Sequence, residues 1–465
     1  MNSVSFVLLP NRKPRKYLLP EQNRFWNAQW LGRLKYANAF KSNKKITGIP
    51  FDKPEVPYTA IYLLSIIKKI GGFKTNLLDI WQPGITELNE EIVLDVLASC
   101  KSKVFLFSPF TNNYSFAKQC VQIIKRTVPD SFCIIGGPHA SYCAKECLHD
   151  GFDIVICGQG EEVLLDILQS RILHKRDYPK IIHGEIGSKG EQERWRDVLP
   201  AYDLLPQKFA RTYYARLFTT HGCPFSCIFC SNTIWKREKV IFMPLNRVSN
   251  ELDLIQKYIK FNEIYINDEN FTMRKDHYEP ITQMLKVRGI PWGCETRVDI
   301  VNQETLKLLS NNGCCEIDYG LESLNKYILK KVNKGINCDD VYRVFSETAN
   351  LGIRTHVNLM VGLPGETIKS AHSTIKQVCE WINEGIINTV DYFVTVPYPG
   401  TELFRNREKF SLTIKTQDWD EYREDSIPVF DLNTLSGAEI FECWKYGLTR
   451  FSEAIEEKWK KGEQL

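Results

Sequence analysis

The stretch Ala215-Arg-Leu-Phe-Thr-Thr220, followed by His221-Gly-Cys-Pro-Phe-Ser-Cys-Ile-Phe-Cys230, places three cysteines in a short loop directly after a strand-like run. Cys223, Cys227 and Cys230 have the spacing C-x3-C-x2-C, close enough together to bind one inorganic cluster. A cubane cluster has four irons and prefers four thiolates, so three cysteines leave one iron open. Catalytic metal sites generally keep such an open position. We therefore expect a catalytic iron–sulfur cluster in this loop.

Two other interpretations of the triplet stay open. His221 precedes Cys223 by two residues and could complete a structural zinc site, and the three thiols could also be free and buried. The chain has 15 cysteines in 465 residues, an odd number that disulfides cannot fully pair. The other cysteines, including Cys143 and Cys147, form no second cluster motif and are expected to pack as small hydrophobic residues.

The chain shows no membrane or secretion signal. Its longest apolar window, Ile61–Ile67, falls well short of the roughly 18 residues that a membrane span needs. The run Val4–Leu9 lacks a preceding basic region and is too short for the core of a signal peptide. We expect a cytoplasmic protein, in a reducing compartment that suits cysteine-bound metal.

Around the triplet, strand-like runs alternate with helical patterns, as in an α/β barrel. Six such units predict an open barrel over residues 213–403, because a complete barrel needs eight. Residues 404–465 are predicted to form a cap or tail, and residues 174–212, rich in glycine and other breakers, a linker. The six strands are expected at Ala215–Thr220, Glu263–Asn267, Trp292–Thr296, Glu316–Tyr319, Thr355–Val361 and Thr389–Thr395.

Residues 1–173 alternate in the same way and predict a separate Rossmann-like domain with a parallel sheet buried on both faces. Residues 11–53 interrupt it with a basic insertion: residues 1–53 carry 11 Lys/Arg against 2 Asp/Glu, although the whole chain is only +4. An anionic or large partner, such as a phosphorylated intermediate, a carrier-bound substrate or RNA, could bind this insertion. The favoured interpretation is a solvated arm whose aromatic residues pack on the domain beneath. The total charge gives no argument for nucleic acid.

With Phe229 before its last cysteine, the triplet resembles that of the radical S-adenosylmethionine (SAM) enzymes, in which the open iron chelates SAM. Segments at the ends of the next strands are similar to SAM-binding segments of this family: Ile266–Thr272, Tyr319–Ser323, Val361–Thr367 and Val396–Thr401. The resemblance covers Ala210 to Leu403. It implies cluster ligation by Cys223, Cys227 and Cys230 and SAM contacts from Phe229, Asp268, Glu269, Arg297, Glu322, Ser323, Gly362 and Gly365.

The first domain resembles the cobalamin-binding domain of cobalamin-dependent radical SAM enzymes. Phe132–Ser141 and Asp153–Glu162 both place glycine-containing turns between a strand and a helix, where backbone can approach a ligand closely. The motif Asp-x-His-x-x-Gly, whose His ligates cobalt in many cobalamin proteins, is absent, so cobalamin binding without a His ligand is implied; a domain that has lost cobalamin is the alternative. The implied cobalamin contacts are Ser108, Gly136, Gly137, His139, Gly158, Gly160 and Glu161.

The resemblance implies a cobalamin-dependent methyltransferase with a [4Fe-4S] cluster, SAM and cobalamin. It would methylate an unactivated carbon or a phosphorus centre of a small-molecule, natural-product or carrier-bound substrate. Its expected partner is an electron donor such as flavodoxin or ferredoxin, and nucleic acid is disfavoured. Two other hypotheses remain: a radical rearrangement, cyclisation or oxidation without methyl transfer, and a non-enzymatic metal-binding or electron-transfer module.

Overall fold

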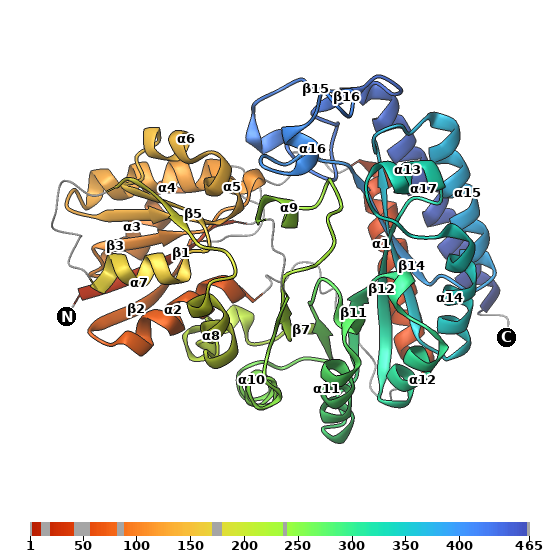
Figure 1. Cartoon of the computed structure of the whole chain (residues 1–465), viewed down its shortest axis with the longest axis horizontal. Coiled ribbons are helices and arrows are strands. Elements are labelled where there is room, and N and C mark those ends of the chain that lie inside the picture. The colour runs from red at the N-terminus through yellow and green to blue at the C-terminus, as the bar shows by residue number, and fades with distance from the viewer. Residues whose placement is uncertain are drawn as a thin grey trace.

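The computed structural model describes residues 2–10, 19–40, 56–80, 88–169, 179–235 and 240–462. Their main elements are two parallel sheets that lie beside each other, one on the left of Figure 1 and one on the right. The architecture is thus α/β, with a Rossmann-like domain followed by a partial barrel, as the sequence predicts.

The first sheet has six parallel strands in the order β2-β1-β3-β4-β5-β6. The strand order reverses at β1 and β3, and ligands of open α/β sheets bind beyond the carboxyl ends of the strands at such a point. The strands are β1 (Asn2–Leu8), β2 (Phe73–Asp79), β3 (Val104–Phe107), β4 (Phe132–Ile135), β5 (Ile154–Gly158) and β6 (Ile181–Gly184). The helices are α2 (Tyr58–Ile70), α3 (Glu90–Ser99), α4 (Tyr114–Thr127), α5 (Gly137–Tyr142), α6 (Ala144–His149) and α7 (Glu161–Gln169).

β6 corrects the prediction that residues 174–212 are only a linker. This range contributes an edge strand paired with β5, followed by α8 (Lys189–Asp197). The strand escapes sequence analysis because its residues are only partly buried, so it lacks the continuous apolar run of the inner strands. Its glycine-rich flanks also read as loop.

The second sheet has six parallel strands in the order β14-β13-β12-β11-β10-β7, and all six predicted barrel strands are present. They are β7 (Tyr214–Leu217), β10 (Glu263–Ile266), β11 (Trp292–Thr296), β12 (Cys314–Glu322), β13 (Arg354–Val361) and β14 (Thr389–Val394). Between them run α10 (Leu245–Tyr258), α11 (Lys275–Val287), α12 (Gln303–Asn311), α13 (Lys326–Lys331), α14 (Cys338–Asn350) and α15 (Ile368–Asn383).

The described part of the basic insertion packs on the barrel instead of on the first domain, which it interrupts in the sequence. Helix α1 (Pro20–Phe40) lies against α17 (Gly437–Gly462) and the edge strand β14. Phe25 is buried in the barrel core, and the Gln29 Oε1 atom accepts a 2.9 Å hydrogen bond from the backbone N–H of Val390. The N-terminal helix thus helps to cover the open edge of the partial barrel (Figure 1).

The C-terminal segment contacts both domains. It contains α16 (Glu402–Arg405), an antiparallel pair of β15 (Leu412–Ile414) and β16 (Phe430–Leu432), a short 3-10 turn η8 (Trp419–Glu421) and α17. α17 packs on α15 and β14, whereas η8 touches α4 of the first domain. Among the described residues, no helix is apolar over a length that could cross a bilayer.

Candidate functional site

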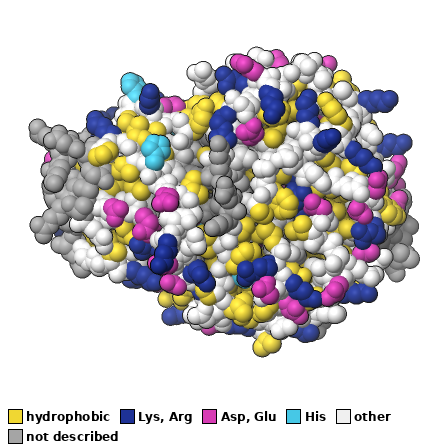
Figure 2. All heavy atoms as spheres, in the orientation of Figure 1, with side chains coloured by type: hydrophobic (Ala, Val, Ile, Leu, Met, Phe, Trp, Pro, Cys, Tyr) yellow, Lys and Arg dark blue, Asp and Glu magenta, His cyan; other side chains and the backbone are white. Residues whose placement is uncertain are grey.

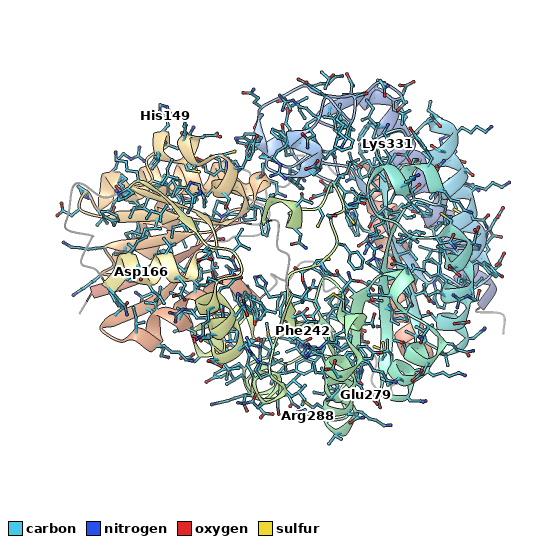
Figure 3. All side chains as sticks on the ribbon, in the orientation of Figure 1. His149, Asp166, Phe242, Glu279, Arg288 and Lys331 are labelled. Carbon is cyan, nitrogen blue, oxygen red and sulfur yellow. The ribbon has the colours of Figure 1, made fainter. Side chains whose placement is uncertain are left out.

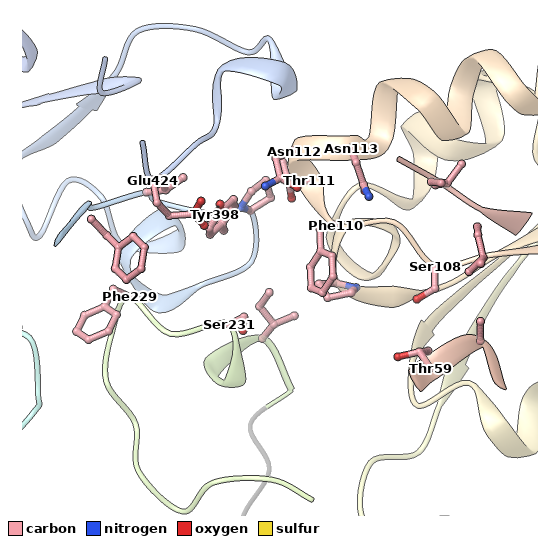
Figure 4. Close-up of a pocket in the computed structure, with 18 of the residues that line it drawn as sticks. Thr59, Ser108, Phe110, Thr111, Asn112, Asn113, Phe229, Ser231, Tyr398 and Glu424 are labelled. Carbon is pink, nitrogen blue, oxygen red and sulfur yellow. Dashed lines mark hydrogen bonds between the residues drawn. The ribbon is translucent and has the colours of Figure 1, made fainter. Parts of the chain in front are cut away.

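The carboxyl ends of both sheets border one pair of adjoining cavities between the domains. The larger cavity, of about 820 Å³, is lined by Ser108 and Phe110 after β3 and by Phe229, Met360 and Val394 of the barrel (Figure 4). The smaller cavity, of about 420 Å³, shares Ser108 and Phe110 with it and extends over the glycine turns of the first domain. Members of both predicted binding groups therefore line these cavities, although they are far apart in the sequence: Phe229 and Glu269 from the barrel, and Ser108, Gly136, Gly137, Gly158, Gly160 and Glu161 from the first domain.

The cysteine loop is fixed by backbone hydrogen bonds to two neighbouring segments. The N–H of Ile228 donates to the carbonyl of Val332 at 3.1 Å, and the carbonyl of Ile228 accepts from the N–H of Leu403 at 2.8 Å. The N–H of Cys230 donates to the carbonyl of Cys227 at 3.0 Å. The segment after α13 and helix α16 thus hold the loop from two sides.

The three thiols lie close enough to influence one another, and nitrogen donors face two of them. Burial raises the pKa of Cys223 and of Cys227. Burial also raises the pKa of Cys230, to about 11, and the charges of the two other cysteines raise it further in the same direction. Asn270 Nδ2 donates to Cys223 Sγ at 3.7 Å, and Arg297 Nη1 to Cys227 Sγ at 3.9 Å. These donors would stabilise thiolates once a metal has displaced the protons.

His221 is engaged away from the cysteines. Its ring stacks on Trp195 of α8 with 4.0 Å between ring centroids, and its Nε2 lies 3.7 Å from the Glu191 carboxylate. It lines the smaller cavity. This arrangement argues against His221 as the fourth ligand of a structural zinc site.

Asp268 and Glu269, adjacent in sequence, have different surroundings. Asp268 is fully buried and accepts hydrogen bonds from the N–H groups of Thr219 (2.7 Å) and Thr220 (3.0 Å). Burial raises the pKa of Asp268 to about 6, although these hydrogen bonds lower it. Glu269 is exposed, lines the smaller cavity and acts electrostatically on Cys223. Asp268 therefore positions the strand end before the cysteine loop, whereas Glu269 faces the cavity.

Behind Cys227 lies a group of charges in which Arg297, Glu322 and Lys334 are buried and Asp299 is exposed. Arg297 forms a two-pronged ion pair with Asp299 (2.9 and 2.8 Å) and stands over the ring of Phe225, 3.8 Å from its centroid. Lys334 pairs with Glu322 at 2.8 Å and acts electrostatically on Cys227.

The end of β12 also carries Ser323, which is 1% exposed and whose Oγ accepts from the N–H of Asn325 at 3.2 Å. Glu322 has φ 67°, a left-handed backbone conformation that non-glycine residues rarely adopt. Such backbone strain clusters at functional sites.

The loop after β13 is stabilised by a buried carboxyl group. Glu366 accepts from the N–H of Gly362 at 2.7 Å, and burial raises the pKa of Glu366 to about 8. Gly362 has φ 83°, and a Cβ there would lie 3.0 Å from Ile440 of α17. Gly365 has φ 86°, and a Cβ there would lie 2.9 Å from Tyr327. Neither glycine lines the two interdomain cavities described above.

In the first domain, the four predicted glycines line the smaller cavity: Gly136, Gly137, Gly158 and Gly160. Gly137 (φ 90°) and Gly158 (φ 89°) adopt conformations that require glycine. A Cβ at Gly137 would lie 2.8 Å from Ser108 Oγ, and one at Gly158 would lie 2.6 Å from the Gly184 carbonyl oxygen. Glycine is therefore required at these two positions both by the backbone conformation and by the close approach of neighbouring segments of the chain.

His139 and Glu161 are more deeply placed than the glycines. His139 is fully buried, lines neither interdomain cavity and stacks on Tyr114 with 4.0 Å between ring centroids. Burial lowers its pKa to about 3. Glu161 lines the smaller cavity and accepts a 3.2 Å hydrogen bond from the indole of Trp195.

Sequence reasoning missed four polar residues around the site. Asn270 and Lys334 surround the cysteine loop, and Tyr398 donates to Glu424 in the wall of the larger cavity (Figure 4). Asn270 lies within Ile266–Thr272, a segment that the sequence marks, so it could have been predicted as a site residue. Tyr398 likewise lies within Val396–Thr401, a segment that the sequence marks, whereas nothing in the sequence around Lys334 or Glu424 marks them.

Comparison with known families agrees with this arrangement. Residues 217–378 match the Radical SAM superfamily, and residues 53–168 match the B12 binding domain. An uncharacterised methyltransferase of Pyrococcus horikoshii is 25% identical over 344 residues, 70% of this chain and 72% of that protein. The anaerobic magnesium-protoporphyrin IX monomethyl ester cyclase of Rubrivivax gelatinosus is 25% identical over 424 residues, 85% of this chain and 73% of the cyclase.

A third relative and a solved structure extend the similarity over most of the chain. The cytidylyl-2-hydroxyethylphosphonate methyltransferase of Streptomyces wedmorensis is 21% identical over 440 residues, 80% of this chain and 82% of that protein. The radical SAM methyltransferase TsrM from Kitasatospora setae, solved with cobalamin and a [4Fe-4S] cluster, has a TM-score of 0.66 and 14% identity, covering 98% of this chain and 89% of TsrM. At this identity the structure supports the fold alone. The chain thus contains a B12-binding domain followed by a radical SAM domain.

Proposed function

We propose that the protein is a cobalamin-dependent radical SAM methyltransferase that acts on an unactivated carbon or a phosphorus centre of a small-molecule or natural-product intermediate. The observation that carries this proposal is the 820 Å³ cavity, which is bordered by the carboxyl ends of both sheets. A methyl group held by the first domain and a radical generated in the second could both reach a substrate in this space.

The cysteine loop fits a [4Fe-4S] cluster with one open iron. Its donor set is three thiols, with N–H donors from Asn270 and Arg297 directed at two of the sulfurs. The buried cation of Lys334 favours the charged form of Cys227. We propose Cys223, Cys227 and Cys230 as the cluster ligands.

The strand ends around the loop fit a zwitterionic ligand such as SAM. Glu269 offers a carboxylate on the cavity side, and Arg297, Glu322 and Ser323 lie at the ends of β11 and β12. Phe229 adds an aromatic face in the larger cavity. We propose that these residues bind SAM together with the loop that contains Gly362 and Gly365. We propose Asp268 as a residue that positions the strand end before the cysteine loop.

The first domain fits a cobalamin bound across its strand ends. Ser108 and the glycine turns leave the backbone accessible along the smaller cavity. His139 has no access to that cavity, so we propose that it packs the domain and leaves cobalt without this ligand. When bound, the cofactors supply an adenosyl radical that takes a hydrogen atom and a methyl group that replaces it.

The chain itself contributes positioning and exclusion of water. Apolar side chains from both domains, among them Phe110, Met360 and Val396, line the larger cavity. A radical intermediate is protected there from side reactions with solvent. We also propose that the cofactor-binding unit comprises residues 1–173 together with β6, and that the chain functions in the cytoplasm, where thiols stay reduced.

A second candidate function is radical cyclisation or oxidation without methyl transfer. It is favoured by the cyclase of Rubrivivax gelatinosus, which aligns with 85% of this chain and thus with both domains. The two candidates differ in the mass of the product.

Anaerobic reconstitution with iron, sulfide and hydroxocobalamin, followed by desalting and metal analysis, tests the proposal. We expect about four irons per chain and stoichiometric cobalt, with the iron lost in Cys227→Ala and retained in the control Cys100→Ala. Incubation with SAM and a reductant should then release 5′-deoxyadenosine. Iron without cobalt would reject methyl transfer from cobalamin, and absence of SAM cleavage would reject the radical SAM assignment.

A further inference from the structure

A third cavity, of about 690 Å³, lies on the outer side of the cysteine loop. Cys223 and Ser226 of the loop line it, as do Lys331 at the end of α13 and Arg405 and Lys409 in and after α16. None of these residues lines the two interdomain cavities. Asn232 lines both this cavity and the smaller interdomain cavity, but no described residue of the first domain lines the third cavity, so the cysteine loop can also be approached from this side.

The walls of this cavity are firmly attached to the loop. Asn333 Nδ2 donates to the backbone carbonyl of Ser226 at 3.0 Å, and Arg405 Nη2 donates to the carbonyl of Thr233 at 3.2 Å. The backbone bonds of Ile228 to Val332 and Leu403 hold the same two walls. A partner that contacts the walls would thus be held at a fixed distance from the cysteines.

The cavity carries an excess of positive charge. Three cations line it, against the single carboxylate of Glu402, which is 3.6 Å from Arg405. Within the described chain, Lys331 and Lys409 form no ion pair, and their Nζ atoms instead stand 5.7 and 5.6 Å from the ring centroids of Tyr327 and Phe410. Figure 3 labels Lys331 beside α13, and Figure 2 shows Lys and Arg side chains on this part of the surface.

We propose that this face, defined by Lys331, Arg405 and Lys409, docks a small acidic electron-transfer protein that reduces the cluster. The inference rests on the proposed function. One electron passes from the reduced carrier, of the flavodoxin or ferredoxin class, to the cluster held by the three cysteines, and the carrier is oxidised by one electron. Electron transfer slows steeply with distance, so the carrier must approach a cysteine closely. The interdomain side has to hold SAM, cobalamin and substrate, which leaves the basic cavity beside Cys223 as the approach.

Complementary charge also gives the interaction an expected signature. Opposite charges accelerate encounter and are screened by salt, so binding should weaken as ionic strength rises. An acidic carrier meets two lysines here, Lys331 and Lys409, that pair with no carboxylate in the part of the chain that the structure describes.

The test compares two double variants with the same change in charge. Lys331→Glu with Lys409→Glu reverses the proposed face. Lys257→Glu with Lys286→Glu reverses two exposed lysines on α10 and α11, at the opposite end of the barrel in Figure 1. Calorimetric binding of an acidic flavodoxin and, separately, an acidic ferredoxin to the iron-reconstituted chain is measured at low and high salt, together with SAM cleavage driven by dithionite.

We expect the first variant to bind the carrier at least about tenfold more weakly than wild type at low salt, and the control variant to bind as wild type does. Dithionite-driven SAM cleavage should be unchanged in both. Equal weakening in the two variants, or wild-type binding by the first, would overturn the docking face. Binding of inorganic phosphate in this cavity without any effect of the lysine pair on the carrier would also overturn it, in favour of a small-anion site. Failure of wild type to cleave SAM with dithionite would reject the proposed function, whereas the binding comparison would still decide the docking face.

Discussion

Glu322 and Lys334 form an ion pair next to Cys227 in which both side chains are only 9% exposed. Burial disfavours the charged form of Lys334, but Glu322 and Cys227 more than offset this and raise the pKa of Lys334. Lys334 is thus charged at neutral pH, and its partner Glu322 has a strained backbone conformation. Its position suggests that it maintains the shape of the site behind the cysteine loop.

Lys334→Met should destabilise the barrel by about 3–5 kcal/mol, because it leaves the Glu322 carboxylate buried without a partner. Urea denaturation followed by circular dichroism measures this loss. The double variant Lys334→Met with Glu322→Gln removes the unpaired charge and should recover part of the stability. If Lys334→Met proved as stable as wild type, the ion pair would have no structural role.

The residue scale also separates what the sequence could and could not predict. The sequence predicts both Asp268 and Glu269 as neighbours of SAM, and in the structure the Asp268 carboxylate accepts hydrogen bonds from the backbone N–H groups of Thr219 and Thr220. Glu269, the next residue, faces the cavity. A sequence motif identifies the residues at a strand end. Which of two adjacent carboxylates faces the cavity depends on how the strand end packs.

At the scale of elements, the loop after β13 depends on a carboxyl group that is uncharged at neutral pH. Glu366 has a pKa raised to about 8 by burial, against an ordinary value of 4.5. Between these two pH values the folded state keeps a proton that the unfolded state has released. The free energy of unfolding therefore decreases as the pH rises through this range.

Glu366→Gln should lose this contribution to pH dependence, because the amide oxygen can still accept from Gly362 and carries no titrating proton. Thermal unfolding at about pH 5 and at about pH 9 checks the prediction. The wild type should lose more stability than the variant between the two conditions. Parallel curves for the two proteins would show that Glu366 does not titrate in this range.

Helix α2 of the first domain meets α10 of the barrel through a buried polar network. Arg247 Nη1 donates to Glu251 at 2.5 Å, and Tyr58 of α2 lies 3.5 Å from the same carboxylate. Tyr202 adds a 3.1 Å hydrogen bond to Glu251. Because Tyr58 and Glu251 come from different domains, this network fixes one side of the domain interface.

Arg247→Met should cost about 3–5 kcal/mol of folding free energy, since Glu251 stays buried with only phenol partners. Arg288→Met is the matched control: it removes a 3.1 Å ion pair with Asp253, whose side chain is 63% exposed, and should cost at most about 1 kcal/mol. Chemical denaturation of both variants makes the comparison. Similar losses in the two would contradict a special role for the α2–α10 network.

At the scale of the whole molecule, the C-terminal segment joins the two domains on the side opposite to α2. Trp419 Nε1 donates to both carboxylate oxygens of Glu146 on α6 (2.9 and 3.1 Å), and its ring contacts His139 edge-on with 5.5 Å between centroids. Ser115 Oγ donates to Asp420 at 2.5 Å. The segment therefore acts as a clasp between α4–α6 and the barrel.

Trp419→Ala should weaken this clasp by on the order of 2 kcal/mol, less than for a fully buried Trp, because the ring is only half-buried. Amide hydrogen exchange in α5 and α6 should accelerate, while exchange in β11 and β12 stays unchanged. Trp419→Phe keeps the aromatic contact and loses only the N–H donor, so its effect should be smaller. Unchanged exchange in α5 and α6 of the alanine variant would exclude the clasp.

The sequence by itself determined the fold class, the order of the domains and the cysteine loop. Buried parallel strands have to be nearly continuous apolar runs, and a C-x3-C-x2-C loop has few other uses, so local composition was sufficient. Helix α1 shows the limit of this reasoning. Its basic composition marked an insertion in the first domain, but only tertiary packing showed that Phe25 completes the barrel core.

The tertiary structure alone decided which residues face one another across the domains. Lys334 beside Cys227, Trp419 beside Glu146 and α1 on β14 are pairs widely separated in the sequence. Such contacts arise from how closely packed surfaces fit together, and no local pattern records them. Periodicity in the sequence indicates which side of a strand or helix is buried. Which element packs on that side depends on the tertiary fold of the whole chain.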